Sequence, residues 1–117
     1  MVKILVVDDS TTDRKLIASA LEGYTVLEAT NGDEAIDRVR RSRPNLIILD
    51  VVMPGKSGFQ TCRELRKMPE AAQTPIVMLT TKHQPTDQEW GLRQGANAYL
   101  TKPFTDEDLL QTVRRYL

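Results

Sequence analysis

The feature that most constrains this chain is a short apolar run that ends at a single carboxylate. Branched residues fill the run from Leu46 to Leu49, Asp50 ends it, and the chain then turns through Pro54 and Gly55. A continuous run of this kind indicates a strand buried on both faces, as in a parallel sheet covered by helices. Open sheets of that class keep their ligand sites at the carboxyl ends of the strands. We therefore expect Asp50 at the functional edge of a parallel sheet.

Four more short apolar segments are predicted to be strands, and a helical pattern follows each of the five. The other predicted strands are Val2–Val7, Tyr24–Ala29, Pro75–Leu79 and Ala98–Thr101. Predicted helices begin at Ser10 or Thr11, Asp33, Gly58, Pro85 and Thr105, and the first uses Leu16, Ile17, Ala20 and Leu21 as its apolar positions. Asn31-Gly32 is predicted to be a turn before the second helix, and the third helix is predicted to run through Cys62, Leu65 and Met68. Strict alternation implies right-handed crossovers and helices on both faces of the sheet. The prediction is one α/β domain over residues 1–117, a doubly wound (βα)5 fold with strand order 2-1-3-4-5.

Charge and cysteine content exclude several classes of protein. Sixteen basic and sixteen acidic residues balance, which gives no general reason to expect nucleic acid or an anionic membrane as a partner. Cys62 is the single cysteine, so no internal disulfide can form, and a reducing compartment fits. No apolar segment is long enough to span a bilayer. We expect a cytoplasmic protein.

The predicted strand order brings three carboxylates to one edge. Strands one and three are neighbours in this order, so Asp8 and Asp9 should lie beside Asp50. Left alone they would repel one another, and a divalent cation removes that cost. Hard oxygen ligands suit Mg²⁺, for which Mn²⁺ can substitute, and no cluster of Cys or His favours zinc. The sequence therefore predicts a magnesium site.

The fourth and fifth strands deliver Thr80 and Lys102 to the same edge. Carboxylates, a hydroxyl, an ammonium and a metal together suit transfer of a phosphoryl group to a carboxylate. Asp50 would be the nucleophile, Lys102 and the cation would neutralise the phosphoryl oxygens, and Thr80 would donate to one of them. A flavin or dinucleotide fits poorly, since neither a G-x-G-x-x-G nor a Walker sequence is present.

Each of these residues also has an ordinary structural interpretation. Paired aspartates in a loop are usually caps or turn residues, and Thr80 or Lys102 alone could end a strand or face solvent. Because all of these residues follow strand ends at the same edge of the predicted sheet, we favour a functional site over the separate structural interpretations. An arginine cluster at Arg38, Arg40, Arg41 and Arg43 is interpreted as a solvated helix end that matches the helix dipole, rather than as a nucleic-acid patch.

The same residues resemble the receiver domains of two-component response regulators, the CheY-like superfamily. The matching positions are Asp8-Asp9, Asp50 with Met53-Pro54 and Gly58, Thr80, and Lys102-Pro103, and the match covers essentially the whole chain. Within the family the chain resembles the single-domain regulators of twitching motility and pilus-based taxis, the PilH type. That narrower likeness is carried by Thr80-Thr81-Lys82, Trp90-Gly91, Arg93-Gln94-Gly95-Ala96 and Tyr99-Leu100-Thr101-Lys102-Pro103. The family also has strand order 2-1-3-4-5, so the resemblance implies that order as well.

The resemblance implies a set of roles at the acidic edge. Asp50 would accept a phosphoryl group from a phosphohistidine on a CheA-like kinase or a histidine phosphotransfer domain. Asp9, Asp50 and the Val52 carbonyl would bind Mg²⁺ directly, and Asp8 would act largely through water. Lys102 would contact the phosphoryl group, and its peptide bond to Pro103 would be cis.

The resemblance also implies a switch and an output surface. Thr80 would move toward the phosphoryl group and Tyr99 would turn inward, as a shift between two existing packings. Trp90, on a mostly polar helix, is either a core anchor or a partner contact. Because the chain ends with its last helix, we expect a monomer that binds a downstream protein in trans, such as one of the type IV pilus machinery, unless the sequence is a piece of a longer regulator.

Two positions that tune self-dephosphorylation in this family hold Val52 and Lys82, and neither can orient a hydrolytic water. The bulk of Thr81, beside the switch residue, could also restrict access to the phosphoryl group. We therefore expect slow self-hydrolysis.

Three functions remain open. The first is a signalling protein that catalyses its own phosphorylation without being a conventional enzyme. The second is a phosphate sink for a shared kinase, which Val52 and Lys82 disfavour. The third is a binding module that works without phosphorylation, and it would not need the complete set of acids, threonine and lysine.

Overall fold

Five parallel strands form one sheet in the computed structural model, which describes residues 1–117. The strands are β1 (Lys3–Val7), β2 (Thr25–Ala29), β3 (Leu46–Leu49), β4 (Ile76–Thr80) and β5 (Ala98–Thr101). Their order across the sheet is β2-β1-β3-β4-β5, and every neighbouring pair is parallel. The predicted fold class and strand order are confirmed.

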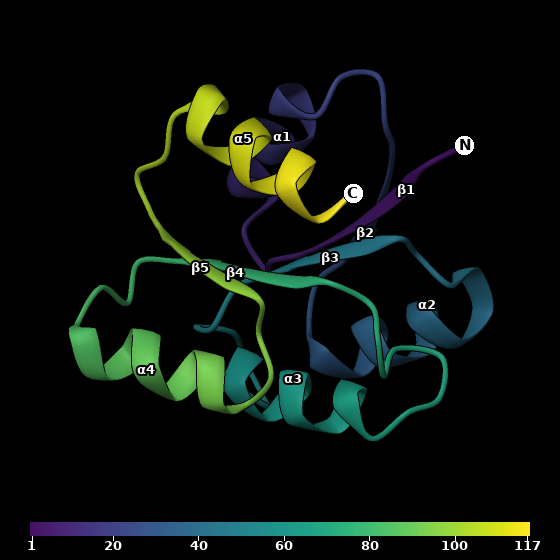
Figure 1. Cartoon of the computed structure of the whole chain (residues 1–117), viewed down its shortest axis with the longest axis vertical. Helices are drawn as coiled ribbons and strands as arrows, with labels where there is room; N and C mark the ends of the chain where they lie inside the picture. The colour runs from purple at the N-terminus through teal and green to yellow at the C-terminus, as the bar shows by residue number, and fades with distance from the viewer.

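Helices cover both faces of this sheet. They are α1 (Thr11–Ala20), α2 (Gly32–Ser42), α3 (Gly58–Arg66), α4 (Pro85–Arg93) and α5 (Asp106–Tyr116). Figure 1 shows α1 and α5 on one face and α2, α3 and α4 on the other. None of these helices has the length and apolar content needed to cross a membrane.

The alternation of side chains along β1 explains why two separate cores form. Ile4 and Val6 pack into the cluster beneath α1 and α5, whereas Leu5 and Val7 pack into the cluster beneath α2 and α3. All four are at most 1% exposed. Full burial of such a side chain contributes roughly 1.5–3 kcal/mol. This two-sided burial makes the sheet a rigid platform for the residues that follow its strands.

Short polar side chains begin four of the helices. Ser10, rather than Thr11, caps α1, and Asn31, Ser57 and Thr105 cap α2, α3 and α5. The Asn31-Gly32 pair, which we predicted as a turn before a helix at Asp33, is instead the start of α2 itself. Asn31 accepts a hydrogen bond from the Glu34 N–H at 2.9 Å. The same short amide that favours a turn also favours a helix cap, because both need a nearby acceptor.

Two helical details differ from expectation. Leu16, predicted on the apolar face of α1, is 55% exposed. With 3.6 residues per turn it lies roughly a quarter turn from the centre of the buried stripe around Ile17. The predicted helix through Met68 ends earlier, at Arg66, because Met68 bonds three residues back and Pro69 has no N–H to continue the helix.

Candidate functional site

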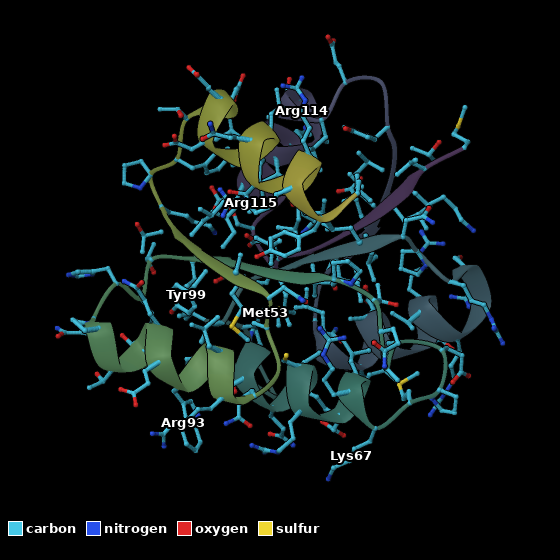
Figure 2. The ribbon with its side chains drawn as sticks, in the orientation of Figure 1. Met53, Lys67, Arg93, Tyr99, Arg114 and Arg115 are labelled. Carbon is cyan, nitrogen blue, oxygen red and sulfur yellow. The ribbon has the colours of Figure 1, made fainter.

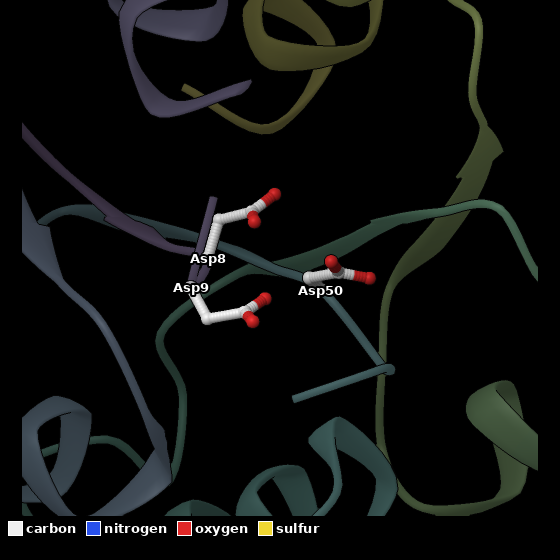
Figure 3. A group of neighbouring side chains, drawn as sticks. All are labelled: Asp8, Asp9 and Asp50. Carbon is white, nitrogen blue, oxygen red and sulfur yellow. The ribbon is translucent and has the colours of Figure 1, made fainter. Parts of the chain in front are cut away.

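Strand pairing brings Asp8 and Asp50 side by side. Val7 pairs with Leu49 in the β1–β3 register, and the Asp50 N–H donates to the Val7 carbonyl at 2.9 Å. Asp8 is 1% and Asp50 6% exposed, while Asp9, one residue further along the loop, is exposed. Figure 3 shows the three carboxylates gathered at this edge of the sheet.

The geometry of these carboxylates fits a divalent cation. One oxygen from each of Asp8, Asp9 and Asp50 lies within 4.8 Å of the others. An octahedral ion with metal–oxygen distances of about 2.1 Å holds its ligand oxygens about 3 to 4 Å apart, so only small side-chain movements are needed. The donor set is all hard oxygen, which matches the preference of Mg²⁺ or Mn²⁺.

The Asp50 carboxylate is oriented by the backbone that follows it. Its Oδ1 accepts hydrogen bonds from the Val51 N–H at 2.7 Å and the Val52 N–H at 3.3 Å. Its Oδ2 faces the Lys102 ammonium at 3.3 Å. A carboxylate held in this way loses little conformational freedom if it has to adopt one fixed orientation.

Lys102 supplies the positive charge at the centre of the cluster. The end of β4 places it, because its N–H donates to the Thr80 carbonyl at 2.8 Å. The peptide bond between Lys102 and Pro103 is cis. Its Nζ donates to Asp8 at 2.7 Å, Asp13 at 2.7 Å and Asp50 at 3.3 Å, and its side chain is 11% exposed.

Burial, hydrogen bonds and neighbouring charges together set the pKa values of this cluster. Burial favours the neutral form of Lys102, but the hydrogen bonds to Asp13 and Asp8 and the charge of Asp50 outweigh it, so the pKa of Lys102 is raised. Burial, aided by the Asp50 charge, raises the pKa of Asp8 despite hydrogen bonds from Lys102 and the Ser10 N–H.

Asp13 is a member of the cluster that the sequence analysis did not select. It lies in the first turn of α1, where an acid is ordinarily explained by the helix dipole. The available signal was its position, since α1 follows the loop that carries Asp8 and Asp9 and so begins at the same edge of the sheet.

Thr80 and Tyr99, the predicted switch pair, both contact Lys82. Thr80 is fully buried, and its Oγ1 accepts from the Lys82 N–H at 3.3 Å. The Tyr99 hydroxyl donates to the Lys82 carbonyl at 2.8 Å. Burial, with smaller contributions from the charges of Asp87 and Asp50, raises the pKa of Tyr99 to about 12. Figure 2 shows Tyr99 between β5 and α4.

Helix α4 is held to the body of the protein through very little apolar surface. Gly91 is its only buried residue and lies against Met78 and the Tyr99 ring. Trp90 is 47% and Leu92 49% exposed. Trp90 is therefore not a core anchor, and its role as a partner contact stays a prediction.

The rim of the site carries the residues that we associated with slow hydrolysis. Val52 is 51% exposed, and Thr81 and Lys82 are also exposed. The Lys82 ammonium lies 3.7 Å from an Asp87 oxygen on α4. None of the three side chains offers a carboxylate or amide near Asp50 that could hold a water.

The loop after Asp50 is anchored by an ion-pair group that the sequence analysis also missed. Lys56 bridges Asp33 of α2 at 2.9 Å and Glu64 of α3 at 3.0 Å, with its side chain 18% exposed. Gly58, the first residue of α3, packs directly on the Asp50 backbone. Both contacts hold the backbone of the loop that follows Asp50 in place.

Comparison with known proteins places this arrangement in a family. The response regulator receiver domain matches residues 4–114. Protein PilH of Pseudomonas aeruginosa is 44% identical over 119 residues, covering 100% of this chain and 98% of that protein. The probable transcriptional regulator ycf27 of Porphyra purpurea is 41% identical over 117 residues, and there the chain spans 47% of the relative.

Solved structures give the same result. Chemotaxis protein CheY4 of Vibrio cholerae is 39% identical with a TM-score of 0.94, covering 100% of this chain and 99% of that one. The receiver domain of a sensor histidine kinase from Pseudomonas aeruginosa, solved with a magnesium ion coordinated in its active-site cleft, is 31% identical with a TM-score of 0.90 and covers 97% of this chain and 95% of that one.

Proposed function

Because this chain belongs to the response regulator receiver domain family, we propose that it is a phosphorelay signalling protein in which Asp50 is the phosphoacceptor. The observation that carries the proposal is the setting of Asp50. Its carboxylate is oriented by two backbone N–H groups, faces the Lys102 ammonium, and lies within 4.8 Å of two further carboxylates.

The proposed reaction moves a phosphoryl group from a phosphohistidine to Asp50. The donor is a CheA-like histidine kinase or a histidine phosphotransfer domain. An Asp50 carboxylate oxygen forms a bond to phosphorus while the phosphorus–nitrogen bond breaks, and the departing imidazole nitrogen keeps the electron pair and takes a proton. Lys102 donates to one phosphoryl oxygen and Thr80 to another, which offsets the charge that gathers on them.

Asp9, Asp50 and the Val52 carbonyl would hold Mg²⁺, or Mn²⁺ in its place, with Asp8 acting through water. The receiver domain of the Pseudomonas aeruginosa sensor kinase, 31% identical to this chain and solved with a magnesium ion in its active-site cleft, supports a magnesium ion at this edge of the sheet. When bound, the ion neutralises phosphoryl charge as a Lewis acid. In its absence Lys102 is the one cation that contacts the carboxylates of Asp8 and Asp50.

Phosphorylation would act on Thr80 and Tyr99 as a population shift. If Thr80 turns toward the phosphoryl group, it gives up its contact with the Lys82 N–H, which lies next to the carbonyl that Tyr99 holds. Motion at the switch would then reach α4, because Gly91 rests on the Tyr99 ring. Exposed Trp90 would contribute to the altered partner surface.

The 44% identity to PilH supports a pathway for this signal, control of type IV pilus motility or taxis through a protein of the pilus machinery. Our proposal has residues 1–117 acting in the cytoplasm as one receiver domain, as a monomer, with a downstream protein as its partner and neither nucleic acid nor a membrane.

Incubation with acetyl phosphate and Mg²⁺ tests the phosphoacceptor proposal. We expect one phosphoryl group per chain by intact mass, lost with a metal chelator and lost in Asp50→Asn. Asp9→Asn should require much more Mg²⁺ for the same yield. A chain that stays unmodified under conditions that phosphorylate a known receiver would contradict the proposal and favour a module that acts without phosphorylation.

The lifetime of the phosphoryl group separates a lasting signal from a phosphate sink. Val52 is exposed at the rim beside Asp50 and its side chain cannot orient a water. We expect Val52→Asn to speed decay of purified phosphoprotein by roughly tenfold, less than the roughly 10²-fold or more of a general base, because an amide can orient a water but cannot take its proton. Val52→Leu serves as the apolar control. Equal decay rates in wild type and Val52→Asn would refute slow hydrolysis at this position, and fast decay in wild type would favour the sink.

A further inference from the structure

All three hydrogens of the Lys102 ammonium are already committed. They are donated to Asp8, Asp13 and Asp50, and the contact with Asp13 is as short as the contact with Asp8, 2.7 Å in both cases. An ammonium has three donors and no acceptor, so the group is fully satisfied. Asp13 lies outside the group of three carboxylates that fits a cation.

A phosphoryl group on Asp50 requires this arrangement to change. For Lys102 to donate to a phosphoryl oxygen, one of its existing contacts must be weakened or lost. The Asp8 side chain is 2% exposed, whereas the Asp13 side chain is 34% exposed at the rim of α1. Water can replace the ammonium at Asp13 far more easily than at Asp8, because an unpaired buried carboxylate is costly. Asp13 is therefore the partner most easily released.

Resting on the proposed function, we propose that Asp13 is a positioning residue that restrains Lys102 on the α1 side of the site in the unphosphorylated protein. Its carboxylate competes with the incoming phosphoryl dianion for the same ammonium. Asp13 thereby slows phosphorylation and weakens the hold of Lys102 on the phosphorylated state.

If Asp13 restrains Lys102, the Asp13→Asn substitution should increase the rate of phosphorylation and not lower it. The amide keeps the shape of the side chain but removes the charge that competes for Lys102 and repels the anionic donor. We expect Mg²⁺-dependent phosphorylation by acetyl phosphate to become roughly three- to tenfold faster, the range expected for one partly exposed charged contact. A variant that is merely misfolded or loosened would not react faster.

Two variants control for other effects of the charge. Asp106 lines the same surface hollow as Asp13 and Lys102 but makes no hydrogen bond or ion pair with Lys102. Asp106→Asn therefore removes an equal charge nearby without releasing the ammonium, and its rate should stay within about twofold of wild type. Asp13→Glu keeps the carboxylate and should restore a rate close to wild type.

A measurement on the metal-free protein tests the hydrogen bond between Lys102 and Asp13 directly. Exchange of the Lys102 ammonium hydrogens with water, followed by ¹⁵N NMR, should be several-fold faster in Asp13→Asn and unchanged in Asp106→Asn. This measurement involves neither Mg²⁺ nor phosphoryl transfer.

The outcomes separate the two proposals. If wild type is phosphorylated while Asp13→Asn is no faster, or if Asp106→Asn accelerates equally, the restraint is wrong and the proposed function stands. Unchanged ammonium exchange in Asp13→Asn also overturns the restraint. A wild-type chain that accepts no phosphoryl group from acetyl phosphate overturns the proposed function and this inference together.

Discussion

Replacing Lys102 with methionine is expected to slow phosphorylation of Asp50 by roughly 10²- to 10³-fold, the usual cost of removing one donor to a developing oxyanion. The same change should lower the free energy of unfolding of the metal-free protein by about 3 kcal/mol, because it leaves buried carboxylates without their counter-charge. Lys102 contacts Asp8, Asp13 and Asp50 with its side chain only 11% exposed, so solvent cannot take over its role.

Two conditions should moderate the loss of stability in Lys102→Met. Added Mg²⁺ should restore much of it, since the cation supplies the missing charge. Acid should reduce it too. Because the pKa of Asp8 is already raised, a fall in pH through that pKa protonates Asp8 and relieves the repulsion, so the deficit relative to wild type is largest at neutral pH and shrinks in acid.

Urea unfolding with and without Mg²⁺, together with the phosphorylation rate, measures these effects. Lys56→Met is the matched control, because Lys56 also bridges two carboxylates with a side chain 18% exposed but does not contact Asp8 or Asp50. Its loss of stability should not be recovered by Mg²⁺. A Lys102→Met protein that reacts within twofold of wild type would remove Lys102 from the proposed mechanism.

Gly58→Ala should be the most damaging of the glycine-to-alanine substitutions in this chain. A Cβ at this position would lie 2.1 Å from the Asp50 carbonyl oxygen and 2.7 Å from the Val51 Cα. Both are backbone atoms, so relief requires moving the segment that holds Asp50. We expect a loss of about 3 kcal/mol or more in the free energy of unfolding, with phosphorylation reduced in the protein that still folds.

The control for Gly58→Ala is Gly55→Ala, in the same loop. Gly55 has φ +78° and no atom within 4 Å of an added Cβ, so the cost there is conformational and should be about 1 kcal/mol. Equal destabilisation of the two variants in urea would show that the close approach to Asp50 does not matter.

The fold was largely predictable from sequence because its strands are short, apolar and separated by clear helix signals. A run such as Leu46–Leu49 has no polar residue that could face solvent, and all four residues are buried in β3. The boundaries were less predictable, because caps and turns use the same residues. Asn31 shows this, since its amide begins a helix where we expected a turn.

The gathering of acids at one edge follows from strand order, and the structure brings Asp8, Asp9 and Asp50 within 4.8 Å of one another. The contacts of Asp13 and Lys56 could not be predicted in the same way. Each contact depends on the conformation of a long side chain between two separate elements, and the hydrophobic periodicity of the sequence does not predict such conformations. The hydrogen-bond partners of the Thr80 and Tyr99 hydroxyls could not be predicted either, although the sequence identifies both residues as the switch pair.

The most direct test of the central claim is to locate the phosphoryl group on the chain. Borohydride cleaves an aspartyl phosphate by reduction, so reduced and unreduced peptides from protein treated with acetyl phosphate and Mg²⁺ can be compared by mass spectrometry. We predict modification at Asp50 alone, absent when Mg²⁺ is removed. Modification at Asp8, Asp9 or Asp13 instead, or none in a folded protein with Mg²⁺ bound, would contradict the assignment of Asp50 as the phosphoacceptor.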